Sequence, residues 1–317
     1  MTLSVVTTLY RSARHLDEFH RRVTEAAGRL TSDYEIVYVN DGSPDDSLDV
    51  ALAIHQRDSR VRVVDLSRNF GHYAALMTGL RHARGDRVFM IDSDLEEAPE
   101  WLNEFHATLD ATGCDVAYGV QRARKGGWFE RGSGWLFYEV VAKRLGVPLP
   151  PNVVTARLMT RRFVDALTSF REREFAILPL CAIAGFVQEP VVVQKISRGR
   201  STYTLARRVA AFVNSVTSFS NRPLVLVFYL GCLIMTASGT AALVLVWRRL
   251  TGGVGVPGYA SLVVSVWFLG GLMIFCIGLV GIYLAKVFIE VKRRPLTIVR
   301  AEYPVREEEV PCIDRRF

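Results

Sequence analysis

The chain has little cysteine and no paired cysteine motif. Its five cysteines are scattered along 317 residues without a Cys-x-x-Cys pair: Cys114, Cys181, Cys232, Cys276 and Cys312. An odd and dispersed set argues against a disulfide framework and a zinc site, and it fits a reducing compartment. A secretory signal is also missing, because a strand-like run at 3–9 stands where a basic segment and an apolar core would be needed. We therefore expect no signal peptide.

Acidic residues are fewer than basic ones, 32 against 39, which gives a net charge of +7. Such an excess suits either nucleic acid or a surface of anionic lipid. Arginines lie next to long apolar runs in the C-terminal third, as the positive-inside rule requires of membrane proteins. We therefore expect a membrane as a partner and no nucleic acid.

Charge is absent from two long runs, Leu224–Trp247 and Tyr259–Ala285. Each is long enough to cross a hydrocarbon core of roughly 30 Å. Two arginines lie in the Gly-rich connector 248–258, whereas the outer flanks carry Arg207, Arg208, Arg222, Lys286, Lys292, Arg293 and Arg294. The sequence predicts a two-span hairpin in the inner (cytoplasmic) membrane with both ends in the cytoplasm. Glycines in the second run allow close helix approach, so a packed hairpin or a homo-oligomer is expected.

The segment 204–221 has Arg207 and Arg208 on one side and apolar residues such as Phe212 and Val216 on the other. This periodicity is typical of an amphipathic helix, either in the membrane interface or in the core of a soluble domain. We favour the interface, because the first apolar run follows directly.

The first 120 residues alternate short apolar runs with helical patterns. The runs lie at 3–9, 34–39, 61–66, 87–91 and 115–118, and helical patterns fill 14–30, 45–57, 72–84 and 99–111. Repetition of strand, helix and strand predicts right-handed crossovers and a mainly parallel sheet covered on both faces. The fold class is therefore α/β and Rossmann-like.

Acidic residues follow the run at 87–91. Asp92, Asp94 and Glu96 are close enough along a tight turn to share one cation, and oxygen ligands suit Mg²⁺ or Mn²⁺. The carboxyl end of a buried strand is also where an open α/β sheet binds its ligand. The alternative is a helix N-terminus with solvated acids.

Two further turns carry polar residues. Asp41, after the second run, is placed either to bind a base or ribose or to form an ordinary Asx-turn. Arg68, in the segment 67–71 before a helix, either holds an anion or only shapes a turn. Residues 120–135 alternate glycine, cations and aromatics, which indicates a loop over a site.

Five segments together resemble a known family: Tyr34–Ser43 (YEIVYVNDGS), Leu66–Gly71 (LSRNFG), Ala83–Asp86 (ARGD), Met90–Pro99 (MIDSDLEEAP) and Glu290–Leu296 (EVKRRPL). Their order is similar to that of polyprenyl-phosphate glycosyltransferases. These are family 2 enzymes of the GT-A fold, such as dolichyl-phosphate mannose synthase and bacterial undecaprenyl-phosphate glucosyltransferases. The likeness covers nearly the whole chain, both apolar runs included.

The resemblance implies an inverting transfer of a sugar from a nucleotide-sugar, with UDP preferred, to a polyprenyl phosphate. It implies catalytic roles for Asp92 and Asp94, a metal site of Asp92, Asp94 and Glu96, and Mg²⁺ or Mn²⁺ as cofactor. Donor contacts are implied for Thr8, Tyr10, Asn40, Asp41, Arg68 and Asp92. Contacts with the acceptor phosphate are implied for Arg122, Arg131, Arg198, Ser201 and Tyr203. For these arginines, simple attraction to anionic lipid is the alternative.

The chain departs from the family pattern at four single positions and in one segment, 8–11, where Thr-Leu-Tyr-Arg stands for Pro-x-Tyr-Asn. Asn40 stands for the first of two acids, Glu96 for a glutamine, Thr155 for an acid and Thr202 for a lysine. These changes touch the donor side, so they bear on the identity of the sugar and the nucleotide more than on the reaction class.

The expected organisation is a GT-A domain at 1–200, an interfacial helix at 201–222, a hairpin at 223–289 and a cytoplasmic tail at 290–317. The expected product is a lipid-linked sugar for cell-surface glycan or lipopolysaccharide modification. A processive polysaccharide synthase would need Gln-x-x-Arg-Trp and more spans. A non-catalytic scaffold or lipid-sugar carrier would not need acids at a strand end.

Overall fold

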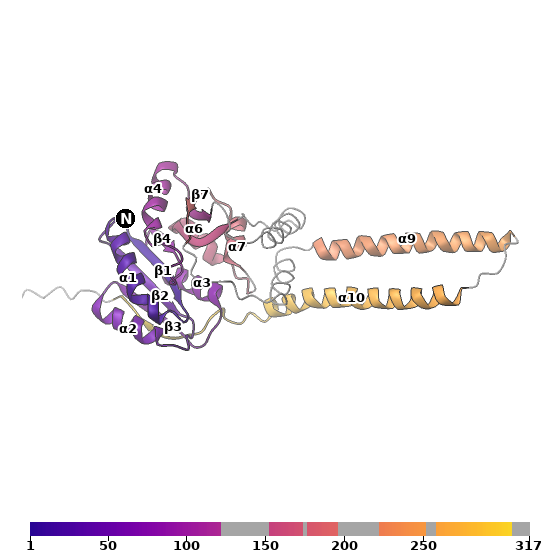
Figure 1. Cartoon of the computed structure of the whole chain (residues 1–317), viewed down its shortest axis with the longest axis horizontal. Coiled ribbons are helices and arrows are strands. Elements are labelled where there is room, and N and C mark those ends of the chain that lie inside the picture. The colour runs from indigo at the N-terminus through magenta and orange to yellow at the C-terminus, as the bar shows by residue number, and fades with distance from the viewer. Residues whose placement is uncertain (122–151, 174–175, 196–221, 252–257, 306–317) are drawn as a thin grey trace, which may run out of the picture. The chain divides into compact units, whose positions relative to one another are not determined.

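The computed structural model describes residues 1–121, 152–173, 176–195, 222–251 and 258–305, which fall into two compact units. The first unit is a sheet with its covering helices and includes the described residues up to 195 and from 294 onward. The second consists of helices α9 (Arg222–Leu250) and α10 (Tyr259–Val291). Figure 1 draws the elements of both units along the chain.

An eight-stranded sheet forms the first unit, in the order β7-β5-β6-β4-β1-β2-β3-β8. The strands are β1 (Leu3–Leu9), β2 (Tyr34–Asn40), β3 (Val61–Leu66), β4 (Arg87–Met90), β5 (Val116–Gln121), β6 (Val153–Thr160), β7 (Gln188–Val193) and β8 (Val299–Tyr303). β6 pairs antiparallel with β4 and β5, and β8 pairs antiparallel with β3. The other pairs are parallel, which confirms the prediction of a mainly parallel sheet.

Helices connect the strands of the sheet. They are α1 (Ala13–Gly28), α2 (Ser47–Arg57), α3 (His72–His82), α4 (Trp101–Thr112), α6 (Arg161–Ser169) and α7 (Ile177–Ala184), of which α6 and α7 lie between β6 and β7. From β1 the chain adds β2 and then β3 on one side, and β4 returns to the other side of β1. This reversal places a topological switch point between β1 and β4, where a doubly wound sheet forms its ligand crevice.

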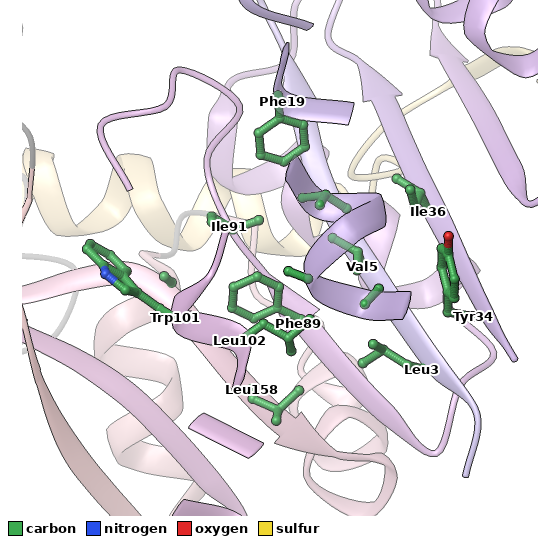
Figure 2. Packing of buried hydrophobic residues seen from close by; sticks show 14 of the residues in the cluster. Leu3, Val5, Phe19, Tyr34, Ile36, Phe89, Ile91, Trp101, Leu102 and Leu158 are labelled. Carbon is green, nitrogen blue, oxygen red and sulfur yellow. The ribbon is translucent and has the colours of Figure 1, made fainter. Parts of the chain in front are cut away.

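Both faces of the sheet are buried. Side chains along β1 alternate between two apolar clusters, one on each face. Leu3, Val5 and Leu9 join one apolar cluster with residues of α1, α2 and α4, whereas Val6 joins a second cluster with α3, α6 and α7. Figure 2 shows the first cluster, where Phe89 of β4 lies beside Leu102 of α4 and Leu158 of β6. Because successive strand residues point to opposite faces, an apolar run without alternation requires a helical layer on each side.

Both predicted apolar runs are helical, and α9 and α10 contact each other. Among the described residues, one helical segment is long and apolar enough to cross a membrane: Phe268–Val291, with 24 residues and a mean hydropathy of 2.4. The helix α10 begins at Tyr259, where the second apolar run was predicted to begin, and it continues past the predicted end at Ala285 to Val291. A membrane hairpin of two spans remains a prediction, and the predicted interfacial helix at 201–222 lies outside the described residues except for Arg222.

Residues after α10 return to the sheet. β8 pairs with the edge strand β3, and Tyr303 packs against the first apolar cluster. Leu296 packs against the second cluster, and the Thr297 hydroxyl lies 2.7 Å from that of Thr78 in α3. Part of the segment predicted as a tail therefore belongs to the sheet, because backbone pairing and these contacts order it against β3.

Candidate functional site

The turn after β4 carries the two aspartates at the switch point. Between them, Ser93 is buried, and its hydroxyl donates to the Thr8 carbonyl at 2.9 Å. The same hydroxyl lies 3.0 Å from that of Ser12, at the start of α1. Asp94 is exposed, and its Oδ1 accepts the Glu96 N–H at 2.9 Å. The turn is thus anchored to β1 through the serine, which leaves the Asp94 carboxylate in solvent.

Asp92 faces a histidine that sequence reasoning missed. His72 Nε2 lies 3.3 Å from Asp92 Oδ1, and His72 Nδ1 lies 3.1 Å from the Thr8 hydroxyl. The imidazole therefore bridges β1 and the turn after β4, across the switch point. Asp92 Oδ1 is itself buried and makes no hydrogen bond to the described residues. His72 follows Gly71, so its place at the end of a singled-out segment was the signal that could have identified it.

Two glutamates and a lysine lie next to the aspartates. Lys195 Nζ is 3.2 Å from Glu96 Oε2 and 3.8 Å from Glu97 Oε1. Glu97 is fully buried and accepts the Thr155 N–H at 3.0 Å. Burial, reinforced by the charge of Asp92, raises the pKa of Glu97 to about 7, although Lys195 and the Thr155 N–H act to lower it. The negative charge of Glu96, which stands where the family has a glutamine, is therefore paired with Lys195. Thr155, which stands for a family acid, binds the Glu97 carboxylate through its backbone N–H.

The three predicted metal ligands are therefore engaged separately: Asp92 with His72, Asp94 with the Glu96 N–H, and Glu96 with Lys195. Within the described ranges, no group of three or more His, Cys, Asp or Glu side chains is gathered so that it could hold a metal ion. The metal site of Asp92, Asp94 and Glu96 therefore stays a prediction, and in this structure Glu96 is paired with Lys195 instead of turning toward the two aspartates. Lys195 follows β7 and is far from this turn in the sequence, so the pair could not be seen in the local motif.

The predicted donor residue Asp41 has both carboxylate oxygens occupied. Oδ1 accepts the Phe70 N–H at 2.7 Å, and Oδ2 accepts the Gly71 N–H at 3.0 Å. Burial raises the pKa of Asp41, although these two backbone donors act to lower it. Asp41 therefore holds the loop that leads into α3, and its predicted contact with a base or ribose stays a prediction.

Asn40 is also directed inward. It is buried, its Nδ2 donates to Asp65 Oδ1 at 2.8 Å, and its Oδ1 accepts the Ser43 N–H at 3.3 Å. A direct donor contact was predicted for this side chain, whereas its two polar atoms are engaged within the protein. The departure from the family pattern at this position has a local reason, because a second acid would face Asp65.

The turn after Asp41 is built around hydroxyl groups. The hydroxyls of Ser43 and Ser47 both donate to Asp45 Oδ1 at 2.5 Å, and the Arg11 N–H donates to the Ser43 hydroxyl at 2.8 Å. Although burial raises the pKa of Asp45, the hydrogen bonds from the two serines outweigh it and lower the pKa to about 2. The loops after β1 and β2 are thus fixed to each other before any ligand arrives.

Two predicted donor residues are open to solvent. Tyr10 is 47% exposed, and the Arg68 guanidinium is exposed and stacks on the Phe70 ring at 4.0 Å. They lie at the carboxyl ends of β1 and β3, on the same edge as Thr8. The predicted acceptor residues Arg122, Arg131, Arg198, Ser201 and Tyr203 lie outside the described residues.

Aspartates at the switch point of this sheet are consistent with the result of comparing the sequence with models of known protein families. Residues 4–168 match the model of glycosyl transferase family 2. The chain belongs to this family. A protein of Mycobacterium tuberculosis that is named as a glycosyltransferase is 50% identical over 303 residues, covering 96% of this chain and 89% of its own length. The glycosyltransferase sll0501 of Synechocystis sp. is 35% identical and covers 94% of each chain.

The α/β sheet of this family 2 glycosyltransferase has the GT-A fold, as the family resemblance implied. Among solved structures, mannosyl-3-phosphoglycerate synthase from Rubrobacter xylanophilus is similar at a TM-score of 0.49, with 17% identity over 69% of this chain and 73% of that one. Glucosyl-3-phosphoglycerate synthase from M. tuberculosis, solved with Mn²⁺, UDP-glucose and phosphoglyceric acid, is similar at 0.47, with 21% identity over 68% of this chain and 79% of that one.

We expect Lys195→Met to lower the thermal midpoint of the glycosyltransferase, by the loss of about 1–3 kcal/mol of unfolding free energy. The reason is that Glu97, buried and next to Asp92, loses its cation. Thermal unfolding followed by circular dichroism measures the effect. Glu96→Gln is the matched control, because it removes the other partner of Lys195 and leaves Glu97 paired. A midpoint equal in Lys195→Met and wild type would contradict this role.

Proposed function

We propose that this glycosyltransferase moves a sugar from a nucleotide diphosphate to the phosphate of a polyprenyl lipid, with inversion at the sugar carbon. The observation that carries the proposal is the pair Asp92 and Asp94 at the switch point of the sheet, beside Thr8 and His72. Acids at this edge suit a donor whose leaving group is a diphosphate. The family resemblance of the whole chain, including its apolar helices, supports the lipid acceptor.

The residues present fit a divalent cation. Asp92 Oδ1 is a buried carboxylate oxygen that makes no hydrogen bond among the described residues, although His72 Nε2 lies 3.3 Å from it, and Asp94 is exposed two residues later. Mg²⁺ in such enzymes is held by one or two carboxylates together with phosphate oxygens, so two aspartates suffice. Asp92 and Asp94 would hold Mg²⁺ or Mn²⁺, and Glu96 would join them only after release from Lys195. When bound, the cation neutralises negative charge on the departing diphosphate.

The acceptor needs positioning more than deprotonation, because a phosphate monoester is already largely ionised near neutral pH. A phosphate oxygen of the lipid forms the new bond to the anomeric carbon, and the bond from that carbon to the diphosphate breaks. The nucleoside diphosphate leaves with the electron pair. Arg68 and the arginines of the loop 120–135 are the proposed cations that bring the two anionic substrates together.

The proposed location is the inner membrane, with the sheet in the cytoplasm. The segment Phe268–Val291 supports it, because its mean hydropathy is 2.4 and its side chains are not buried in the protein. We propose that α9 and α10 together form the two-span hairpin that brings the enzyme to its lipid substrate. Packing of hairpins into a homo-oligomer belongs to the same proposal, on the glycines of α10.

The experiment is transfer of radiolabelled sugar from a panel of UDP-, GDP- and dTDP-sugars to undecaprenyl phosphate, with purified full-length protein and Mg²⁺ or Mn²⁺. A chloroform-soluble product made from one donor would establish the reaction and identify the nucleotide and the sugar. Omission of the metal and of the lipid phosphate are the controls. No product from any donor, together with no binding of nucleoside diphosphate, would favour a non-catalytic scaffold instead.

A further inference from the structure

The edge strand β8 carries a bulge beside the donor-side loops. In its antiparallel pairing with β3, Asp65 stands opposite Ala301, and Leu66 stands opposite Val299. The register therefore skips Arg300, which is the extra residue of the bulge. Bulges of this kind bend a strand locally and redirect a side chain, and they occur often next to active sites.

The redirected arginine reaches the end of β3. Arg300 Nη1 lies 3.5 Å from Asp65 Oδ2, and Nη2 donates to the Ser67 carbonyl at 2.6 Å. Directly before this strand, the Ile298 carbonyl accepts the Ser67 N–H at 2.9 Å. Both backbone groups of Ser67 are thus bound to the segment 298–300, at the start of β8. Ser67 begins the loop that carries Arg68 and ends at Gly71, so β8 fixes the start of this loop.

Asp65, the partner of Arg300, also binds Asn40 of β2. Asp65 is buried, with 4% of its side chain exposed, whereas 58% of the Arg300 side chain is exposed. A buried carboxylate is costly without a cation or hydrogen bonds, and Asp65 has both, from Arg300 and from the Asn40 amide. Asn40 in turn accepts the Ser43 N–H and so holds the turn after Asp41. A continuous set of polar contacts joins Arg300 to both donor-side turns.

We propose that Arg300 and Asp65 are positioning residues for the nucleotide-sugar: they orient Asn40 and Ser67 and thereby set the spacing of the two donor-side loops. This inference rests on the proposed function, because its substrate is the donor of that reaction. It explains why Asn40 replaces an acid: Asn40 and Asp65 are register partners on neighbouring strands, and the acid stands on β3, within reach of Arg300. The strand that follows α10 is therefore part of the donor site.

The test is binding of UDP and GDP to the full-length protein by calorimetry, together with the KM and kcat for the donor. We expect Arg300→Gln to raise the donor KM and the dissociation constant for the nucleoside diphosphate by about three- to thirty-fold, with a much smaller change in kcat. Arg300→Lys keeps a charge near Asp65 and should recover part of the affinity, although it cannot reproduce both contacts of the guanidinium.

Arg162→Gln is the matched control. Arg162 is an exposed arginine paired with the buried Asp115, which precedes β5 at the amino edge of the sheet. The substitution therefore breaks the same kind of pair, an exposed arginine with a buried aspartate, at a place that is distant from the donor-side loops. A fall in thermal midpoint is expected for both arginine variants, but a loss of nucleotide affinity only for Arg300→Gln. Equal loss of affinity in the two would show a general effect of stability and would overturn the inference.

Moving the acid between β3 and β2 gives a second test. Asn40→Asp places two carboxylates side by side and should weaken nucleotide binding. The double variant Asn40→Asp with Asp65→Asn again has one acid and one amide, so it should recover part of the nucleotide affinity. Binding to wild type with unchanged affinity in Arg300→Gln and Asn40→Asp would overturn this inference alone. No binding of any nucleotide to wild type would overturn the proposed function, and the inference with it.

Discussion

Asp94→Asn is expected to reduce kcat by about 10²- to 10³-fold, while the protein folds as wild type. The carboxylate is exposed, and its hydrogen bond within the described residues is made by Oδ1, which accepts the Glu96 N–H. An asparagine oxygen can accept the same bond, so the turn should persist. What is lost is one negative charge at the place proposed for the divalent cation, and with it stabilisation of the departing diphosphate.

Initial rates with saturating donor and undecaprenyl phosphate measure this loss, and Mn²⁺ titration in the presence of nucleoside diphosphate gives a second readout. Asp33→Asn is the matched control, because it neutralises an exposed aspartate that directly precedes β2, at the amino edge of the sheet. Wild-type kcat in Asp94→Asn would remove Asp94 from the catalytic group and leave Asp92 alone. An unchanged thermal midpoint is needed for the rate to be interpreted.

The parallel part of the sheet could be predicted from sequence because its signals are local. Short Val- and Ile-rich runs separated by amphipathic helices specify strands buried on both faces, and the observed β1 to β5 lie where these runs lie. The place of Asp92 and Asp94 followed from the same logic. In a parallel sheet, each strand that ends in polar residues delivers them to one edge.

The partners of these residues could not be predicted, because they come from distant parts of the chain. His72 meets Asp92 from the start of α3, and Lys195 meets Glu96 from the end of β7. Arg300 and Ser67 are 233 residues apart in the sequence. A motif shows that Asp41 follows a strand, but whether its carboxylate faces a ligand or the Phe70 and Gly71 N–H groups depends on the packing of two loops.

Gly42 lies where the loop after β2 closely approaches the loop after β3, and Gly42→Ala is expected to lower both stability and donor binding. A Cβ at this position would lie 2.4 Å from the Arg68 carbonyl carbon and 2.4 Å from the Asn69 nitrogen. These are backbone atoms, so the loop itself must move rather than a flexible side chain. Gly42 also has φ +57°, where residues with a Cβ are strained.

Together, overpacking and strain should cost about 2–4 kcal/mol of unfolding free energy, which corresponds to a fall of roughly 5–12 °C in thermal midpoint. Gly113→Ala separates the two causes, because Gly113 has φ +67° and no atom within 4 Å of its Cβ position. It should therefore show the strain alone, about 1 kcal/mol, with unchanged affinity for nucleoside diphosphate. Equal effects of the two substitutions on both stability and affinity would mean that the close approach of Gly42 to Arg68 and Asn69 does not determine the donor site. A loss of affinity confined to Gly42→Ala would instead identify the spacing of these loops as the property on which donor recognition depends.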